Sequence, residues 1–309
     1  HRVLLTGTPL QNNLHELWAL LAYVIPNTLS SSAFDAAASV GLDDGNLDRS
    51  AVAQARALLE SMMVRRVKSE VETSLLPKVE FVLKPPLTPL QRSWYRQLLG
   101  SVTRGGGGGS SSAADGDGLL SLAQLQSRLM QLQKVVNHPK AIALTLDRDR
   151  AAAAAKHAAA AGSSFIKLPP TDNSHLSAAA RQDEAALRGL TGESLVASSG
   201  KLAMLDRLLR RCKAAGSRAL IFSQYTLSLD VLEEYARYRW GDLGSAYFRL
   251  DGTTNRIARE MDMRSFNEDG SSAFLYLIST RAGGQGINLA TADVVVLYDT
   301  CYNPQVDLQ

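Results

Sequence analysis

The sequence predicts an α/β fold built around a parallel sheet. From Ser199 onward, short apolar runs alternate with longer amphipathic stretches, as a parallel sheet with helices on its faces requires. A glycine-rich turn separates two of the apolar runs, 274–278 and 294–297. With 309 residues and 45% hydrophobic content, the chain can bury one large core or two smaller ones.

The first residues predict a strand end, a turn and a helix. Val3 to Leu5 are expected to end a buried strand, and residues 6–9 to form a turn that carries two hydroxyl groups. The helix that follows should end at Ile25–Pro26. Its apolar face is expected to consist of Leu14, Leu17, Leu20 and Leu21.

The next part of the chain predicts two helices joined by an extended connection. A helical stretch over about 51–68 precedes the connection at 77–84. Thr88 is typical of an N-cap, and Gln91, three residues further on, completes a capping box. The second helix should therefore open there and run through Leu99.

Two segments of unusual composition interrupt the helical pattern that follows. Residues 105–118 are dominated by glycine, serine and aspartate and predict a flexible surface insertion. Helical periodicity returns over 119–136 and stops at 137–139, Asn-His-Pro, whose His138 is expected to be structural. Residues 151–161 are almost all alanine, which favours a helix, although so short an isolated helix is marginal in water.

The last third of the chain predicts the sheet itself. The expected helices are 201–215, 226–239 and 255–268. The expected strands are 218–223, 246–250, 273–278 and 293–298.

Composition restricts the function classes. A net charge of +3 is mildly basic and permits nucleic-acid binding without demanding it. No apolar run approaches the roughly 20 residues that span a bilayer, and no secretory signal opens the sequence. Cys212 and Cys301 lie far apart and lack neighbouring metal ligands, which argues for a reducing compartment and against a zinc site.

The glycine-rich turn predicts a phosphate contact. Gly283, Gly284 and Gly286 crowd into four positions after an apolar run. Glycines at this density let the backbone approach a ligand and point several N–H groups at it. A tight turn between core strands is the alternative explanation of the same pattern.

Several motifs occur in an order that resembles one known family. Residues 6–13, Thr-Gly-Thr-Pro-Leu-Gln-Asn-Asn, resemble motif three of the SWI/SNF and ISWI chromatin-remodelling ATPases of helicase superfamily two. Leu-Ile-Phe-Ser-Gln at 220–224 resembles motif four, and Arg-Leu-Asp-Gly-Thr at 249–253 follows it. The segment 279–299 resembles motif five, and 303–309 resembles the start of motif six, with a leaning toward the ISWI branch.

The resemblance covers most of the chain and implies a division into RecA-like helicase lobes. Residues 1–76 would be the end of lobe one with a helical protrusion. Residues 77–198 would be a linker and helical protrusion with low-complexity insertions. Residues 199–309 would be a nearly complete lobe two.

The parts of the motor that hold ATP are not found in the sequence. A Gly-x-x-x-x-Gly-Lys-Ser/Thr pattern is absent, and Gly200–Lys201, the nearest approach, is followed by leucine and predicts a helix start. Asp-Glu-Ala-Ala at 183–186 predicts a solvated helix face. By the resemblance, the first motifs would precede His1 and the arginine fingers would follow Gln309, so an inactive fragment is expected.

The resemblance assigns coupling and nucleotide-facing roles. Thr6, Gly7 and Thr8 would relay the state of the nucleotide to the DNA contacts, although the hydroxyls of Thr6 and Thr8 could merely cap a turn. Gly286 and Asn288 would face the nucleotide from the second lobe, with helix capping as the alternative for Asn288. ATP and Mg²⁺ are the implied cofactors, and their main binding residues are expected to lie outside this sequence.

The resemblance also implies contacts to the DNA backbone. Thr280, Arg281, Gly283 and Gly284 would hold a phosphate, although Arg281 could brace the loop against an acidic neighbour. Weaker candidates, for which ordinary strand-end packing is the alternative, are Ser223, Gln224, Arg249 and Gly252. Tyr302 stands where the family usually has tryptophan and would stack against the DNA strand, unless it is buried in the core.

The implied parent protein is a nuclear, ATP-dependent remodeller that moves along double-stranded DNA and shifts nucleosomes. Its partners would be DNA, histones and remodelling-complex subunits, with no membrane. One alternative is a non-catalytic scaffold that keeps the second lobe for binding partners or DNA. Another is a dinucleotide or nucleotide-sugar enzyme that uses the 279–299 loop, which would need an acidic ribose-binding residue about 20 positions on.

Overall fold

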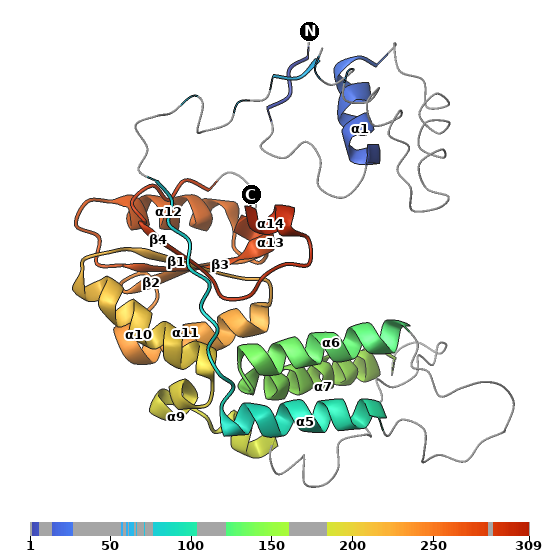
Figure 1. Ribbon diagram of the computed structural model, residues 1–309, viewed down its shortest axis with the longest axis vertical. Helices are drawn as coiled ribbons and strands as arrows, with labels where there is room; N and C mark the ends of the chain where they lie inside the picture. The colour runs from blue at the N-terminus through green and yellow to red at the C-terminus, as the bar shows by residue number, and fades with distance from the viewer. Residues whose placement is uncertain are drawn as a thin grey trace, which may run out of the picture. The chain divides into compact units, whose positions relative to one another are not determined.

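The computed structural model of the chain forms two compact units, His1–Leu83 with Asn303–Gln309, and Lys84–Tyr302 (Figure 1). The residues it describes are 2–5, 14–26, 57, 60, 62–64, 66, 71, 77–103, 122–160, 184–283 and 287–308. No helix in these ranges is long and apolar enough to cross a membrane.

The first unit contains helix α1, Leu14–Val24, and the short helix α14, Pro304–Leu308. The predicted helix after the first turn is therefore confirmed, but the predicted buried strand is wrong. Val3 is 82% exposed, Leu5 is 96% exposed, and residues 2–5 belong to no strand. A strand needs a hydrogen-bonded neighbour, and none of the described strands pairs with these residues.

The second unit is built on a four-stranded sheet in the order β2-β3-β1-β4. The strands are β1 (Ala219–Ser223), β2 (Tyr247–Leu250), β3 (Leu275–Ser279) and β4 (Val294–Leu297). All three pairings are parallel, and Ile221 in β1 lies between Leu277 and Val296. The four predicted strands are thus confirmed, and their carboxyl ends meet at one edge.

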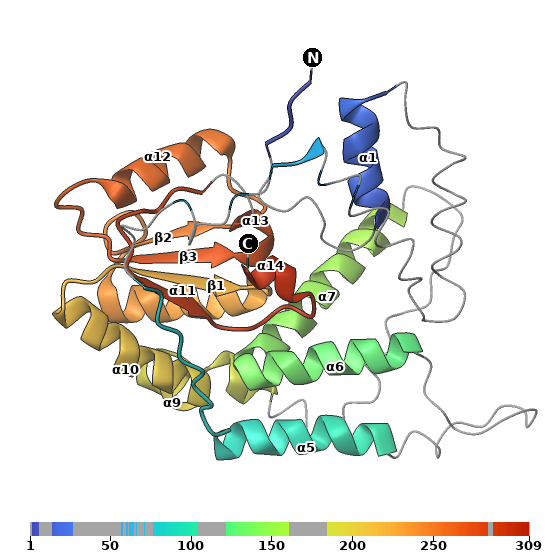
Figure 2. The ribbon, with the colours of Figure 1, turned by 45° about the horizontal axis from the view of Figure 1, so that its top comes forward.

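Helices cover both faces of the sheet (Figure 2). On one face lie α10 (Gly200–Ala214) and α11 (Thr226–Trp240), which contribute Leu205 and Leu232 to a core with Ile221. On the other face lies α12 (Arg256–Asn267), and the short helix α13 (Thr280–Gly283) follows β3. Burial on both faces explains why β1 and β3 read as continuous apolar runs. The edge strand β4 differs, because Val295 and Leu297 are exposed although its sequence is also apolar throughout.

A helical subdomain precedes the sheet within the same unit. It consists of α5 (Pro89–Thr103), α6 (Leu122–Asn137), α7 (Lys140–Ala160), a helical segment at 184–188, and α9 (Gly192–Ala197). Helix α6 packs against both α5 and α7. Trp94, Val135 and Leu187 lie in its core.

The predicted start of α5 and the predicted stop of α6 agree with the structure, whereas α5 runs to Thr103, beyond the predicted end at Leu99. Thr88 Oγ1 accepts from the Gln91 amide at 3.2 Å, and Gln91 Oε1 accepts from the Thr88 amide at 3.1 Å, which completes the capping box. Helix α6 ends at Asn137 as expected, and the alanine-rich stretch is helical through Ala160. The predicted insertion at 105–118 lies outside the described residues, as does most of the stretch 51–68.

The prediction of a solvated helix face at 183–186 is wrong for Glu184. Residues 184–186 are helical and Ala185 and Ala186 are exposed, but only 2% of Glu184 is exposed. Arg150 donates to its two carboxylate oxygens at 2.7 and 3.0 Å, and Arg188 also contacts it. Two guanidinium groups neutralise the carboxylate and make its burial tolerable.

Candidate functional site

The carboxyl edge of the sheet gathers most of the described candidate residues. Ser223 ends β1 and Gln224 follows it, Gly252 follows β2, and Thr280 to Gly283 follow β3. Arg249 lies in β2 itself. The candidates Thr6, Gly7, Thr8, Gly284 and Gly286 lie outside the described residues.

Asp299, which sequence reasoning missed, organises this edge. Its carboxylate accepts from Ser223 Oγ at 2.6 Å, from the Gln224 amide at 2.7 Å and from Asn137 Nδ2 at 2.9 Å. Burial raises the pKa of Asp299, although these hydrogen bonds and the charge of Lys201 oppose the rise. The signal that could have found it is an aspartate placed directly after the apolar run 294–298.

The Asp299 contacts define what Ser223 does in this structure. Ser223 is fully buried and its hydroxyl donates to Asp299, so its polar group is already engaged. Ordinary packing at the end of a strand, the alternative explanation, therefore accounts for Ser223 without a ligand. Gln224 differs, because only its backbone amide is used by Asp299 and its side chain is partly exposed.

Lys201 belongs to the same group of contacts and not to a phosphate loop. Its ammonium group donates to Asn137 Oδ1 at 2.8 Å and to the Tyr298 carbonyl at 3.0 Å. Burial lowers the pKa of Lys201, while the charge of Asp299 raises it. Helix α10 starts at Gly200 with Ser199 as N-cap, as the sequence predicted.

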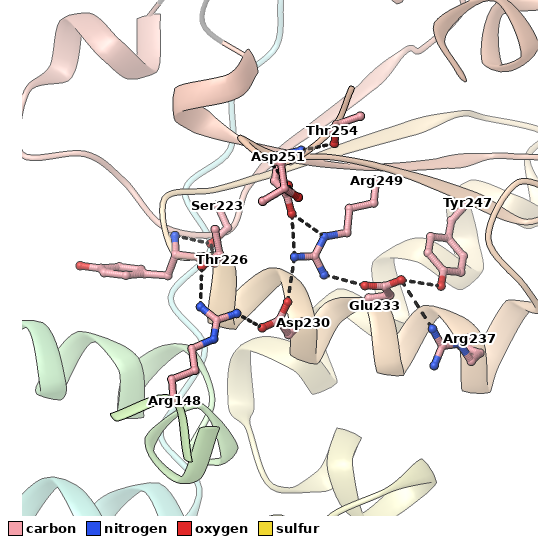
Figure 3. A network of polar contacts seen from close by, with 12 residues as sticks. Arg148, Ser223, Thr226, Asp230, Glu233, Arg237, Tyr247, Arg249, Asp251 and Thr254 are labelled. Carbon is pink, nitrogen blue, oxygen red and sulfur yellow. Dashed lines mark hydrogen bonds and ion pairs between the residues drawn. The ribbon is translucent and has the colours of Figure 1, made fainter. Parts of the chain in front are cut away.

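Arg249 is held by carboxylates from two elements (Figure 3). Its guanidinium contacts Asp230 at 2.8 Å and Asp251 at 2.9 Å, and it also pairs with Glu233. Burial lowers the pKa of Arg249, but the hydrogen bonds to Asp230 and Glu233 outweigh burial and raise it. Arg148 on α7 joins this network through Asp230 at 2.7 Å. The group therefore ties the helical subdomain to β2.

The turn after β2 is held by hydrogen bonds to Asp251 and presents open backbone. Asp251 Oδ1 accepts from the Thr253 amide at 2.9 Å, and the Asp251 amide donates to Thr254 Oγ1 at 3.0 Å. Gly252 between them is exposed, and a Cβ built on it would meet no atom within 4 Å. The backbone at Gly252 can therefore be approached closely by a ligand.

The segment after β3 combines a buried hydroxyl, an exposed charge and a packed glycine. Thr280 is 6% exposed, and its Oγ1 is buried with no hydrogen-bond partner among the described atoms. Arg281 is exposed and forms no ion pair within the described part of the chain. A Cβ on Gly283 would lie 2.7 Å from Ile278 Cγ2 and 2.9 Å from Phe222 Cε1, so core packing alone requires glycine there.

Asn288 is the one predicted nucleotide-facing residue that lies within the described residues. Asn288 is exposed, and its carbonyl accepts from Asn267 Nδ2 at 2.7 Å. No helix begins at Asn288, so helix capping does not explain it. Within the described ranges, no three His, Cys, Asp or Glu side chains are placed to hold a metal ion.

Tyr302 is exposed, which removes burial in the core as an alternative for this residue. Its side chain is 68% exposed, and its hydroxyl accepts from Gln133 Nε2 of α6 at 2.7 Å. Sequence reasoning did not single out Gln133, because no local pattern relates it to a residue so distant in the chain.

Two family models match the chain in succession. The SNF2-related domain matches residues 1–141, and the helicase conserved C-terminal domain matches residues 200–309. The second match contains the whole sheet and its carboxyl edge.

Curated relatives match along the full length of the chain. The human SWI/SNF-related matrix-associated actin-dependent regulator of chromatin subfamily A member 1 is 40% identical over 314 residues, which is 100% of this chain and 25% of the human protein. An ISWI chromatin-remodeling complex ATPase of Arabidopsis thaliana is 40% identical over 313 residues, 100% of this chain and 24% of that protein. The chain thus spans about a quarter of the length of the relatives it matches.

Among solved structures, the Sulfolobus solfataricus SWI2/SNF2 ATPase core in complex with dsDNA is similar to this chain with a TM-score of 0.46 and 21% identity. The match covers 95% of this chain and 50% of that one.

Proposed function

The chain belongs to the SNF2-related family of helicase-like, chromatin-remodelling ATPases, and from this premise we propose that it is part of a motor that moves along double-stranded DNA and shifts nucleosomes. The observation that carries the proposal is the succession of an SNF2-related and a helicase C-terminal domain, together with 40% identity to a chromatin remodeller over the whole chain.

The carboxyl edge supports a backbone-reading contact to DNA. It offers the open backbone at Gly252, the exposed charge of Arg281 and the exposed ring of Tyr302. Neutral amides and an arginine can hold phosphates without reading bases. We assign the contact role to these residues first, then to Gln224, which follows β1, and to Thr280 and Gly283, which belong to α13 with Arg281. Gly284 remains a proposed contact by the resemblance. Ser223 and Arg249 instead support this edge, because their polar groups are engaged by carboxylates.

The wider proposals follow from the family. ATP with Mg²⁺ is the proposed fuel, with Thr6, Gly7 and Thr8 as coupling residues and Gly286 and Asn288 as nucleotide-facing residues. The proposed division is 1–76 for the end of lobe one, 77–198 for the linker and protrusion, and 199–309 for lobe two. Nucleosomes, histones and remodelling-complex subunits are the proposed partners, the nucleus is the proposed location, and the ISWI-like branch is the proposed subfamily.

DNA binding by this chain should be independent of sequence and sensitive to salt. Affinity for a duplex is expected to fall roughly tenfold or more between about 50 and about 200 mM salt, because phosphate contacts release condensed counterions. Fluorescence anisotropy with labelled duplexes of two unrelated sequences measures both properties. Arg281→Gln should reduce the slope of log affinity against log salt by about 1.

The matched control for Arg281→Gln is Arg207→Gln, which removes the same charge from an exposed position on α10. This variant should keep the wild-type slope. Equal wild-type affinity at both salt concentrations, or a strong preference for one sequence, would contradict backbone-dominated binding.

The 309-residue chain alone should not turn over ATP. The sequence holds no Gly-x-x-x-x-Gly-Lys-Ser/Thr loop, and its only Gly-Lys pair is engaged at the start of α10. Phosphoryl transfer in such motors depends on that loop and on arginines that position the phosphates. Phosphate release is therefore expected to stay at the blank rate with and without DNA, in a preparation shown to bind DNA. Turnover that co-purifies with the chain refutes this expectation.

A further inference from the structure

Two residues on one face of α6, Gln133 and Asn137, form hydrogen bonds with the segment that follows β4. Gln133 and Asn137 are four residues apart and so lie on the same side of the helix. Asn137 Nδ2 donates to Asp299 at 2.9 Å, and the Asn137 carbonyl accepts from Tyr298 Oη at 2.8 Å. One turn earlier, Gln133 Nε2 donates to Tyr302 Oη at 2.7 Å. Helix α6 therefore sets the path of residues 298–302.

The tip of the Tyr302 ring is held although most of the residue is exposed. Although 68% of the side chain is exposed, its hydroxyl is held by a partner 169 residues away in sequence. A solvated tyrosine otherwise samples several side-chain rotamers. A hydrogen bond at the tip of the ring restricts that freedom while leaving most of the side chain accessible to a ligand.

The partner side chain is itself fixed at its other end. Gln133 Oε1 accepts from Tyr225 Oη, and Tyr225 is the N-cap residue of α11. The Tyr225 carbonyl accepts from the amides of Ser228 and Leu229 at 2.9 and 3.1 Å. Because a phenol hydroxyl can both donate and accept, either orientation of the Gln133 amide keeps both hydrogen bonds. Gln133 thus forms a bridge of two hydrogen bonds that connects Tyr225, at the start of α11, to Tyr302.

We propose that Gln133 is a positioning residue that holds the Tyr302 ring ready to pack against a DNA strand. The proposal rests on the DNA contact proposed for Tyr302 and adds the hydrogen bond from Gln133 that orients its ring. An aromatic ring restricted before binding loses less conformational entropy when it stacks or wedges against the strand. The hydrogen bond between Gln133 and Tyr302 joins two uncharged groups. Breaking it should therefore change DNA affinity without changing the release of counterions.

The test compares DNA affinity and its salt dependence across four variants. Tyr302→Ala removes the ring and should weaken binding roughly tenfold. Gln133→Leu and Tyr302→Phe each break only the bridge and should weaken binding about threefold to fivefold, with an unchanged salt slope. Because Gln133→Leu already removes the hydrogen bond that Tyr302→Phe removes, the double variant should bind no more weakly than Gln133→Leu. Gln126→Leu, at an exposed position of α6 two turns before Gln133, and Tyr238→Phe on α11 are matched controls that should bind like the wild type.

The outcomes separate the bridge from the wider function. If Gln133→Leu and Tyr302→Phe bind DNA as tightly as the wild type, the positioning role of Gln133 is wrong even when Tyr302→Ala binds DNA weakly, because the ring then acts without being positioned. The positioning role is also wrong if Tyr302→Ala binds DNA as tightly as the wild type. In that case the proposed function still holds, provided that DNA binding by the wild type is sensitive to salt. Failure of the wild type to bind DNA would remove both. Thermal unfolding of each variant identifies a loss of fold, and Tyr302→Phe, which deletes one exposed oxygen, keeps the test decisive if Gln133→Leu unfolds.

Discussion

Replacing Gln91 by leucine is expected to lower the unfolding free energy of the unit Lys84–Tyr302 by about 4 kcal/mol, since buried groups that lose their hydrogen bonds cost about 1–3 kcal/mol each. Gln91 is fully buried and uses both ends of its amide. Oε1 accepts from the amides of Thr88 and Gly200 at 3.1 and 3.0 Å. Nε2 donates to the carbonyls of Val135 and Val136, each at 2.9 Å.

Leucine has a similar volume but leaves four backbone groups without partners at a junction of three helices. The amides of Thr88 and Gly200 precede or begin helices α5 and α10, and the two valine carbonyls lie in the last turn of α6. Such groups have no partner within their own helix. Neighbouring backbone cannot move in easily, because a Cβ on Gly200 would lie only 1.9 Å from the Pro86 carbonyl oxygen. The full loss is reduced only where water reaches one of the four groups.

Urea unfolding followed by circular dichroism measures the effect of Gln91→Leu. Gln97→Leu on the same helix is the matched control, since Gln97 is exposed and should change stability by less than about 0.5 kcal/mol. Loss of less than about 1 kcal/mol in Gln91→Leu would show that the four backbone groups find other partners. The interpretation of Gln91 as the link between α5, α6 and α10 would then be wrong.

Gln91 also shows which part of the structure could be predicted from sequence. Its bond with Thr88 depends on residues three apart, and the capping box was predicted from that spacing alone. Its bonds to Val135 and Gly200 depend on how α5 packs, and no local pattern specifies them. The same division applies to the whole second unit. The strands and helices of 200–297 follow from apolar periodicity, which is a short-range property.

The residues that sequence reasoning missed or misjudged all depend on distant partners. Asp299 and Asn137 are 162 residues apart, and Gln133 and Tyr302 are 169 apart. Glu184 looks like a solvated residue until Arg150, on a different helix, is placed beside it. Arg249 likewise has the charge of a DNA contact. Its partner Asp251 is only two residues away, but the packing of α11 against β2 is needed to reveal Asp230 and Glu233. The positions of the motifs were therefore predictable from the sequence, whereas the burial and the polar partners of each side chain were not.

His138 shows the same dependence on tertiary contacts and leads to a prediction about pH. The residue is fully buried directly after α6. Nδ1 accepts from the Lys140 amide at 3.1 Å, so the proton lies on Nε2, which is 2.9 Å from the Leu195 carbonyl. Burial lowers the pKa of His138 from 6.5 to about 4, opposed by the bond to Leu195 and aided by the charge of Lys140. A second proton would have to displace the Lys140 amide from Nδ1.

The sign of the pH effect follows from this lowered pKa. Between pH 6.5 and about 4 the unfolded chain binds a proton at His138 that the folded chain excludes. Stability from the neutral ring is therefore complete above pH 6.5 and is lost as the pH falls toward 4, about 3 kcal/mol in all. Between about pH 7 and 5, where most carboxylates stay ionised, His138 should account for a loss of about 2 kcal/mol.

Urea unfolding at pH 7, 6 and 5 measures this loss, and His138→Gln, which keeps an amide donor for the Leu195 carbonyl, should flatten the dependence. Burial raises the pKa of Asp299, so that carboxyl favours the folded state as the pH falls and cannot imitate the histidine effect. If His138→Gln does not fold, the ring of His138 in the wild type can be titrated directly by nuclear magnetic resonance. A ring that titrates near 6.5, or a His138→Gln variant with the wild-type pH dependence, would mean that His138 is hydrated and that the junction of α6, α7 and α9 opens in solution.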